Sequence, residues 1–184
     1  MRNRIEDAAL NVRAFRTEDV HPLHAAVSES IAEVAPYETW CHAAYTVDDA
    51  AEYVGWWRTA WERGIAYYYA VEDRSSGELL GACGLSGYSA EHRHAMLGYW
   101  IRTSWTGRGV ATRAARRVCT AGFVDLDLIR IGISVPVGNR ASRRVAEKLG
   151  AVKEGVLRSG LILPASPTDV MAYGLLPDER IDPG

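Results

Sequence analysis

Four short segments in the first half of the chain have the pattern of β-strands. Apolar and polar residues alternate over residues 11–15, and residues 65–72, 79–86 and 94–101 have strand-like composition. A turn sequence, Arg-Ser-Ser-Gly at residues 74–77, separates the second of these segments from the third. The pattern therefore predicts a β-hairpin at this point, with its two strands antiparallel.

Two longer segments in the same half begin with helix-capping residues. Thr17, followed by Glu-Asp, predicts a helix over residues 17–34 with the threonine as its N-cap. Thr46, followed by Val-Asp-Asp, repeats the capping pattern and predicts a second helix over residues 46–63. Gly64 is expected to end that helix, because glycine is the residue most often found just after a helix C-terminus.

The second half of the chain alternates between strands and helices. The pattern predicts a helix over residues 109–122, a strand over 129–135, a helix over 139–149, and strands over 151–157 and 168–175. Strand–helix–strand order implies right-handed parallel crossovers, whereas the hairpin implies antiparallel pairing. We therefore expect an α/β fold with a mixed sheet, formed as a single domain over residues 1–184.

Composition excludes several classes of protein. The chain is 48% hydrophobic and 24% charged, which is typical of a globular domain and excludes a disordered one. No apolar run approaches the roughly 18–20 residues of a membrane span, and the first residues lack a secretory signal. Cys41, Cys83 and Cys119 lie far apart with no CxxC motif, which favours reduced, buried thiols over disulfides or zinc. We expect a cytoplasmic protein with no membrane partner and no metal site.

Charge is distributed unevenly along the sequence. The net charge of −2 does not indicate a nucleic-acid partner. However, residues 102–144 hold nine arginines and only two acidic residues, so the remainder of the chain is acidic. A basic segment in an acidic protein indicates an anion bound at one place. The alternative is that individual arginines pair with acidic residues elsewhere in the fold.

A glycine-containing loop precedes the helix that is expected at residue 109. Its sequence, Thr106-Gly-Arg-Gly-Val-Ala-Thr112, follows a predicted strand, and free amides at a helix start can bind phosphate oxygens. A plain glycine turn is the alternative explanation. A dinucleotide-binding GxGxxG loop fits less well, because Thr112 stands at the third glycine position and the loop does not open a first βαβ unit.

Five short motifs in series give the chain a family resemblance. They are Leu97-Gly-Tyr-Trp-Ile101, Thr106-Gly-Arg-Gly-Val-Ala-Thr112, Asn139-Arg-Ala-Ser142, Glu147-Lys-Leu-Gly150 and Lys153-Glu-Gly-Val-Leu-Arg158. In this order and spacing they resemble the GNAT acetyltransferases, in particular the RimJ/RimL-type branch, whose known members acetylate protein N-termini, including those of ribosomal proteins. The resemblance implies a mixed, mostly antiparallel sheet with a splayed pair of parallel strands, flanked by helices.

The resemblance also implies acetyl-CoA as cosubstrate and a set of residues that bind it. The backbone of Tyr99, Trp100 and Ile101 is expected to pair with the pantetheine arm. The amides of Gly107, Arg108, Gly109, Val110, Ala111 and Thr112 are expected to hold the pyrophosphate. Asn139 is expected to contact the pantetheine, with Ser142 near the thioester sulfur.

The general base that the family often carries is absent from its usual places. Met96 stands where relatives often have Glu, and Leu161 stands at a second such position. An α-amine of pKa ~7.8 needs roughly 1 kcal/mol to become neutral at pH 7, and a lysine of pKa ~10.4 needs about 4.6 kcal/mol. A weak base therefore favours an N-terminal amine. His94 is the candidate base, because it shares a strand face with Met96 and an imidazole generally titrates near neutral pH; a plain surface histidine is the alternative. Glu91 and Asp169 are weaker candidates.

Ser142 is the candidate acid for the departing thiolate, although such an acid is not essential for a leaving group of pKa ~8.5. If Asn139 is a helix N-cap, Ser142 stands at the third helical position, where it can serve only in capping. Tyr173 is an alternative acid.

The acceptor side of the site is expected around the second helix. Tyr53, Trp57 and Trp61 recur every four residues, with Trp56 beside them, which fits either core packing or the wall of an acceptor pocket. Nearby acidic residues favour a cationic amine or a basic peptide, unless they form a solvated helix face.

Together these observations predict an N-acetyltransferase that moves acetyl directly from acetyl-CoA to a primary amine, such as a protein or peptide N-terminus. A small-molecule amine acceptor and an inactive CoA-binding module are the alternatives. A homodimer is also compatible with the family resemblance.

Overall fold

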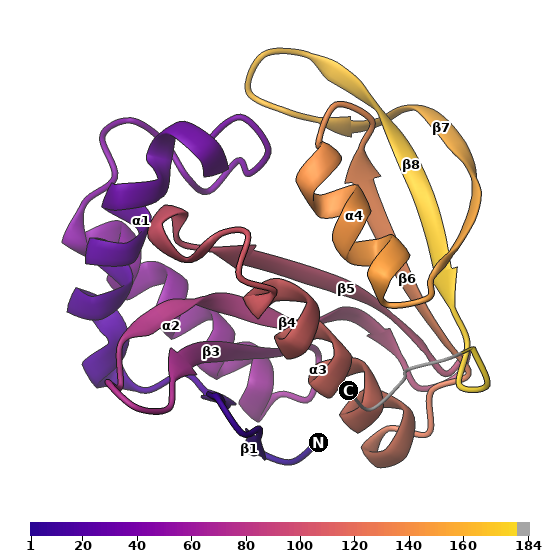
Figure 1. Ribbon diagram of the computed structural model, residues 1–184, viewed down its shortest axis with the longest axis horizontal. Helices are drawn as coiled ribbons and strands as arrows, with labels where there is room; N and C mark the ends of the chain where they lie inside the picture. Colours follow the sequence, from indigo (N-terminus) through magenta and orange to yellow (C-terminus); the bar gives the residue numbers. More distant parts are fainter. Residues whose placement is uncertain (180–184) are drawn as a thin grey trace.

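The chain forms one eight-stranded sheet with helices on both faces (Figure 1). The structure is a computed structural model and describes residues 1–179. The strands are β1 (Arg4–Glu6), β2 (Leu10–Ala14), β3 (Tyr67–Asp73), β4 (Leu79–Ser89), β5 (His94–Ile101), β6 (Arg130–Pro136), β7 (Val152–Ile162) and β8 (Pro167–Leu175). Their order in the sheet is β1-β2-β3-β4-β5-β6-β8-β7, and only the β5–β6 pair is parallel. The predicted mixed, mostly antiparallel sheet is confirmed.

The helices form two layers around this sheet. They are the short 3-10 helices η1 (Thr17–Asp19) and η2 (Thr103–Trp105), and the α-helices α1 (Val20–Val34), α2 (Val47–Glu62), α3 (Val110–Asp125) and α4 (Arg140–Lys148). α1 and α2 pack in a hydrophobic cluster with Ala82 and Trp100, whereas α3 packs in another with Cys83 and Leu97. Because alternate strand residues point to opposite faces, the two clusters lie on opposite sides of the sheet.

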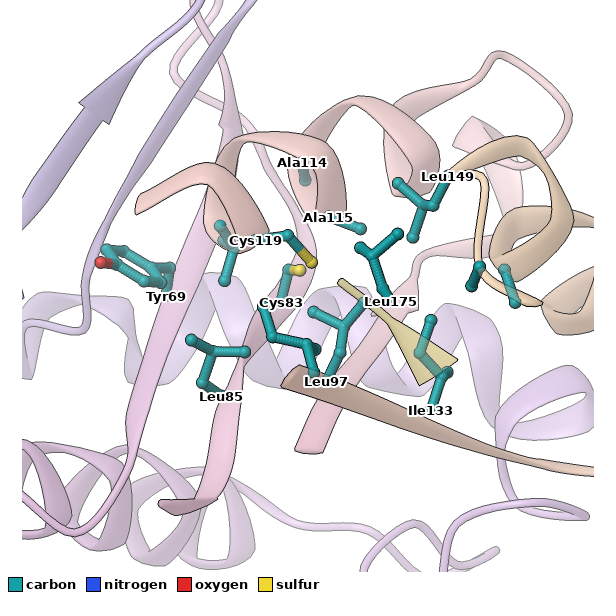
Figure 2. Close-up of a cluster of buried hydrophobic side chains, with 14 of the residues drawn as sticks. Tyr69, Cys83, Leu85, Leu97, Ala114, Ala115, Cys119, Ile133, Leu149 and Leu175 are labelled. Atoms are coloured by element: carbon teal, nitrogen blue, oxygen red, sulfur yellow. The ribbon is translucent and has the colours of Figure 1, made fainter. Parts of the chain in front are cut away.

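The core beneath α3 contains two of the three cysteines. Figure 2 shows Cys83 of β4 and Cys119 of α3 side by side, with Leu97 and Leu85 next to them. All three cysteines are buried and free, as the sequence predicted. None of the helices within residues 1–179 is long and apolar enough to span a membrane.

The predicted start of the first helix is wrong. Thr17 is not its N-cap: a 3-10 turn begins after Arg16, and α1 follows only at Val20. Asp19 organises this turn, because its carboxylate accepts hydrogen bonds from the Arg16 N–H (2.7 Å) and from the buried Arg13 guanidinium (2.6 and 2.7 Å). The Thr46 cap is confirmed, with reciprocal hydrogen bonds to Asp49.

The second half of the sheet differs from simple parallel crossovers. β5, α3 and β6 form the expected parallel unit, but β8 lies between β6 and β7 and is antiparallel to both. β6 and β7 therefore run parallel to each other, as the strand–helix alternation predicts, but β8 lies between them. The last strand fills that place because it follows β7 through a hairpin connection and pairs along both edges.

Two glycines make room for a tyrosine ring above the sheet. Tyr68, Gly84 and Gly98 are partners in register across β3, β4 and β5. A Cβ on Gly98 would lie 1.9 Å from the Tyr68 hydroxyl oxygen, and one on Gly84 would lie 2.5 Å from the Tyr68 ring. The ring therefore lies flat over both glycines, where it stacks on Trp57 of α2 with the ring centroids 3.8 Å apart.

We expect Gly98→Ala to destabilise the protein by about 1–3 kcal/mol, because the added methyl group displaces the tyrosine hydroxyl. Urea denaturation measures this change in the free energy of unfolding. Tyr68→Phe in the same chain should recover part of the loss, because the ring carbon behind the hydroxyl lies 3.1 Å away. Gly55→Ala is the matched control: it is an exposed helical position with open space, where alanine should stabilise by roughly 0.5–1 kcal/mol. Equal changes in the free energy of unfolding for Gly55→Ala and Gly98→Ala would contradict the conclusion that the Tyr68 side chain needs a glycine at position 98.

Candidate functional site

The parallel strands β5 and β6 separate partway along their length. They pair only from His94 to Met96, opposite residues 130–132, and then diverge (Figure 1). Beyond Met96, β5 pairs only with β4, and β6 pairs only with β8. The facing edges of the two strands therefore carry backbone N–H and C=O groups with no strand partner, and such groups need a ligand or water. Tyr99, Trp100 and Ile101 all lie on this free part of β5.

The predicted phosphate loop follows β5 directly. Gly107 and Gly109 have positive φ angles of 75° and 78°, a conformation that glycine adopts without strain. Gly109 is the N-cap of α3 and provides no side-chain cap, and the first turn of the helix contains no acidic residue. The amides of Val110, Ala111 and Thr112 are therefore free of a side-chain cap, at the positive end of a 16-residue helix.

The nine arginines of residues 102–144 divide into two groups. Four form ion pairs, with Glu29 and Glu78, with Asp7, or with Glu154: they are Arg102, Arg113, Arg117 and Arg130. The other five have no carboxylate partner among residues 1–179: they are Arg108, Arg116, Arg140, Arg143 and Arg144. Three of these five line a cavity of about 250 Å³ on α4, together with Glu147. Unpaired positive charge therefore lies along α4, from its first residue onward.

Ser142 of α4 faces Tyr99 of β5. The Tyr99 hydroxyl donates to the Ser142 carbonyl (2.9 Å), and the two hydroxyl oxygens are 3.0 Å apart. Asn139 is the N-cap of α4, and its Oδ1 accepts from the Ser142 N–H at 3.0 Å. The serine is therefore the third helical residue, as the capping alternative stated, but its hydroxyl contacts the tyrosine rather than the cap. Burial raises the pKa of Tyr99, so its phenol stays protonated at neutral pH.

His94 lies on the opposite face of β5 from this hydroxyl pair. By strand alternation it shares a face with Met96 and Trp100, which is the face covered by α1 and α2. Its register partner is Arg130, in the paired half of the strands, and its ring is nearly parallel to that of His92, with the centroids 5.8 Å apart.

The other weaker candidates are already engaged or lie apart from the opening. The Asp169 carboxylate accepts from the Ser159 N–H at 2.9 Å. Tyr173 is buried, and its hydroxyl donates to Glu147 at 3.3 Å. Met96 lies over Gly132, where a Cβ would be 2.6 Å from its sulfur, so this position holds an apolar side chain across the two strands.

A cavity of about 430 Å³ lies beside α2, on the face opposite the arginines. Its lining includes five aromatic rings and two carboxylates, as follows: Thr39, Trp40, His42, Tyr45, Asp49, Glu52, Tyr53, Trp56 and Trp57. The Tyr45 hydroxyl and the Trp57 indole N–H are buried without a hydrogen-bond partner within residues 1–179. Trp56 is 61% exposed. The aromatic stripe of α2 is thus divided, because Tyr53 and Trp57 line the cavity, whereas Trp61 packs against Tyr69 at 4.9 Å.

From the sequence, Glu38 is only one of the acidic residues of the acceptor region and has no predicted catalytic role. It lies in the loop between α1 and α2, and its carboxylate accepts from the Trp40 indole N–H at 2.9 Å. Burial raises the pKa of this carboxyl. In the sequence, Glu38 lies between the aromatic residues Tyr37 and Trp40. No neighbouring residue in the chain indicates that its carboxylate becomes partly buried.

Comparisons with known proteins agree with this geometry. The family described as "Acetyltransferase (GNAT) domain" matches residues 9–152. The Bacillus subtilis protein YdaF, provisionally named a ribosomal N-acetyltransferase, is 38% identical over 121 residues. This match covers 65% of the chain and 66% of YdaF, just under two thirds of that relative's length.

Two solved structures have the same fold. One is RimL, a ribosomal L7/L12 alpha-N-protein acetyltransferase, in complex with coenzyme A; its TM-score is 0.88 at 23% identity, with 96% of this chain and 99% of RimL covered. The other is the microcin C7 self-immunity acetyltransferase MccE, in complex with acetyl-CoA and AMP. Its TM-score is 0.86 at 17% identity, with 92% and 93% of the two chains covered.

Loss of the Asn139 cap should weaken the start of α4. We expect Asn139→Ala to lower the free energy of unfolding by about 1 kcal/mol, because the Ser142 N–H loses its acceptor. Thermal and urea unfolding measure this loss. Asn139→Asp keeps a side-chain acceptor and should retain most of the stability; an equal loss in both variants would show that the cap is not the cause.

Proposed function

Because the chain belongs to the acetyltransferase (GNAT) domain family, we propose that it transfers an acetyl group from acetyl-CoA directly to a primary amine. One observation carries this proposal: the free edge of β5 is followed by the start of α3, whose first amides have no side-chain cap, and Arg108 lies in the loop before it without a carboxylate partner among residues 1–179. The pantetheine arm of coenzyme A is extended and polar and ends in phosphates. It can pair with the strand edge while its phosphates bind the helix amides. The buried cysteines support direct transfer, since burial raises the pKa of Cys41 to about 11 and of Cys119 to about 12, which disfavours a thiolate nucleophile.

The cosubstrate is assigned to the residues that the family resemblance implies. The backbone of Tyr99, Trp100 and Ile101 would pair with the pantetheine, and the amides from Gly107 to Thr112 would bind the pyrophosphate. Arg108 and the arginines of the α4 cavity would neutralise further phosphate charge. Asn139 and Ser142 would stand beside the thioester end. The hydroxyls of Ser142 and Tyr99 would then be the donors closest to the departing sulfur.

A protein or peptide N-terminus is the proposed acceptor. The α-amine needs about 3.5 kcal/mol less than lysine to reach its neutral form at pH 7. The names of YdaF and RimL refer to ribosomal proteins as substrates, which supports the same acceptor class. We expect the reaction to take place in the cytoplasm, where free thiols such as these three stay reduced. A homodimer stays a prediction.

A small amine is the second candidate acceptor. The cavity beside α2 has a volume of about 430 Å³ and aromatic walls, which suits a compact cationic molecule as well as a peptide end. The structural similarity to MccE, described as bound to acetyl-CoA and AMP, fits this alternative. Turnover measured with a peptide library and with a panel of small amines separates the two acceptor classes. Binding of acetyl-CoA without thiol release from any amine would favour the inactive module.

Gly109→Ala should weaken binding of coenzyme A. Residue 109 has space for a Cβ, so the cost lies in its positive φ angle, about 1–2 kcal/mol for a non-glycine residue. In the free variant the loop can relax away from this conformation, and binding must then restore it, so isothermal calorimetry should show roughly a 5–30-fold loss of affinity for acetyl-CoA. Gly155→Ala on β7 also has open space but no positive φ, and it should bind normally. The phosphate-loop assignment would be wrong if the two variants bound equally well.

Acceptor preference tests the N-terminal assignment. At pH 7 we expect a peptide α-amine to be acetylated several hundredfold faster than a blocked peptide with a lysine side chain, in keeping with the 3.5 kcal/mol difference. Thiol release measures both rates, and the preference should shrink as the pH rises. A clear preference for lysine at pH 7 would refute the assignment.

A further inference from the structure

Glu38 is the most enclosed free carboxylate on the acceptor side of the sheet. The loop between α1 and α2 holds it beneath the Trp40 indole, whose N–H donates to its Oε2 at 2.9 Å. Among residues 1–179 it forms no ion pair, and no other side-chain donor binds it. Its second oxygen therefore remains able to accept a proton or a hydrogen bond.

The rings around Glu38 connect it to the free part of β5. Trp40 packs against Tyr53 with the centroids 4.8 Å apart and against Trp100 at 5.5 Å. Trp100 lies on β5, two residues after Gly98, over which the Tyr68 hydroxyl is placed. Burial raises the pKa of both Tyr53 and Tyr68, and the charge of Glu38 raises both further. Trp40 also lines the 430 Å³ cavity, so the same indole borders the cavity, Glu38 and β5.

The groups that face Glu38 leave it without a positive partner. They are Cys41 of the same loop, Tyr53 of α2 and Tyr68 of β3, and burial raises the pKa of all three, that of Cys41 to about 11. They stay neutral near pH 7. Burial raises the pKa of Glu38 as well, which makes its carboxylate a stronger base than an exposed glutamate.

The other candidates are less well placed. Met96 has no proton-accepting group, and the Asp169 carboxylate accepts from the Ser159 N–H. His94 lies in the paired half of β5, two residues before the strands part, which corresponds to roughly 6–7 Å along a strand.

We propose that Glu38 is the catalytic base of the transfer, contributed by the α1–α2 loop in place of the β5 carboxylate common in the family. This inference rests on the proposed function. The protonated acceptor gives one proton to the Glu38 carboxylate, and the freed nitrogen lone pair forms a C–N bond with the thioester carbon. The C–S bond then breaks, a second amine proton leaves with the sulfur as thiol, and one hydrogen remains on the amide. Glu38 finally releases its proton to water.

The test compares Glu38→Gln with the wild-type protein. Glutamine keeps an acceptor for the Trp40 N–H but cannot take a proton, so the variant should fold and should bind acetyl-CoA with unchanged affinity by calorimetry. We expect kcat for a peptide α-amine to fall about 10²-fold at pH 7. With an acceptor amine whose pKa lies below the assay range, the acid limb of the wild-type kcat/KM profile reports the protonation of Glu38, and this limb should disappear in the variant. An acceptor amine that is already neutral at the assay pH should show a smaller defect.

Two matched variants make the result specific. Glu62→Gln removes an equal charge from an exposed position on α2 and should leave the rate and the pH profile unchanged. His94→Gln should keep the acid limb. The proposal is overturned if Glu38→Gln keeps wild-type activity and its acid limb, or if His94→Gln alone removes that limb. Wild-type protein that binds acetyl-CoA but acetylates no amine would reject the proposed function itself, and the base with it.

Discussion

The site depends on the point at which β5 and β6 stop pairing. After Met96 each strand remains bonded along its outer edge, β5 to β4 and β6 to β8, while the inner edges lose their partners. Backbone amides and carbonyls that lose a partner need another one, so the sheet itself creates a polar slot. The chain then leaves β5 through η2 and starts α3 within a few residues, which places the uncapped helix amides at the end of the same slot.

The two faces of the sheet carry different functional groups, because alternate residues of one strand point to opposite faces. On the α3–α4 face, Tyr99 contacts Ser142, and arginines without a carboxylate partner line a cavity on α4. On the α1–α2 face, Gly98 and Trp100 lie beneath a layer of aromatic rings. An anionic cosubstrate and an amine acceptor can thus approach the same strand from different sides.

The aromatic layer on the acceptor side is closely packed and sets what that face can hold. Tyr68 can lie flat only because Gly84 and Gly98 have no side chains, and Trp57 then stacks on it. This packing holds Trp40 against Trp100 beside the partly buried Glu38, and burial raises the pKa of that carboxyl.

The sequence by itself determined the elements whose signals are local. Most strand and helix positions, the Thr46 cap and the glycine loop before α3 follow from residues close together in the chain. The first helix start was mispredicted because Asp19 is held by Arg13, on a different element. Only the tertiary structure decided which arginines pair, where β8 inserts, and that Glu38 is enclosed while His94 lies outside the opening. Burial, charge pairing and strand order depend on groups far apart in the sequence, and short-range patterns carry no information about them.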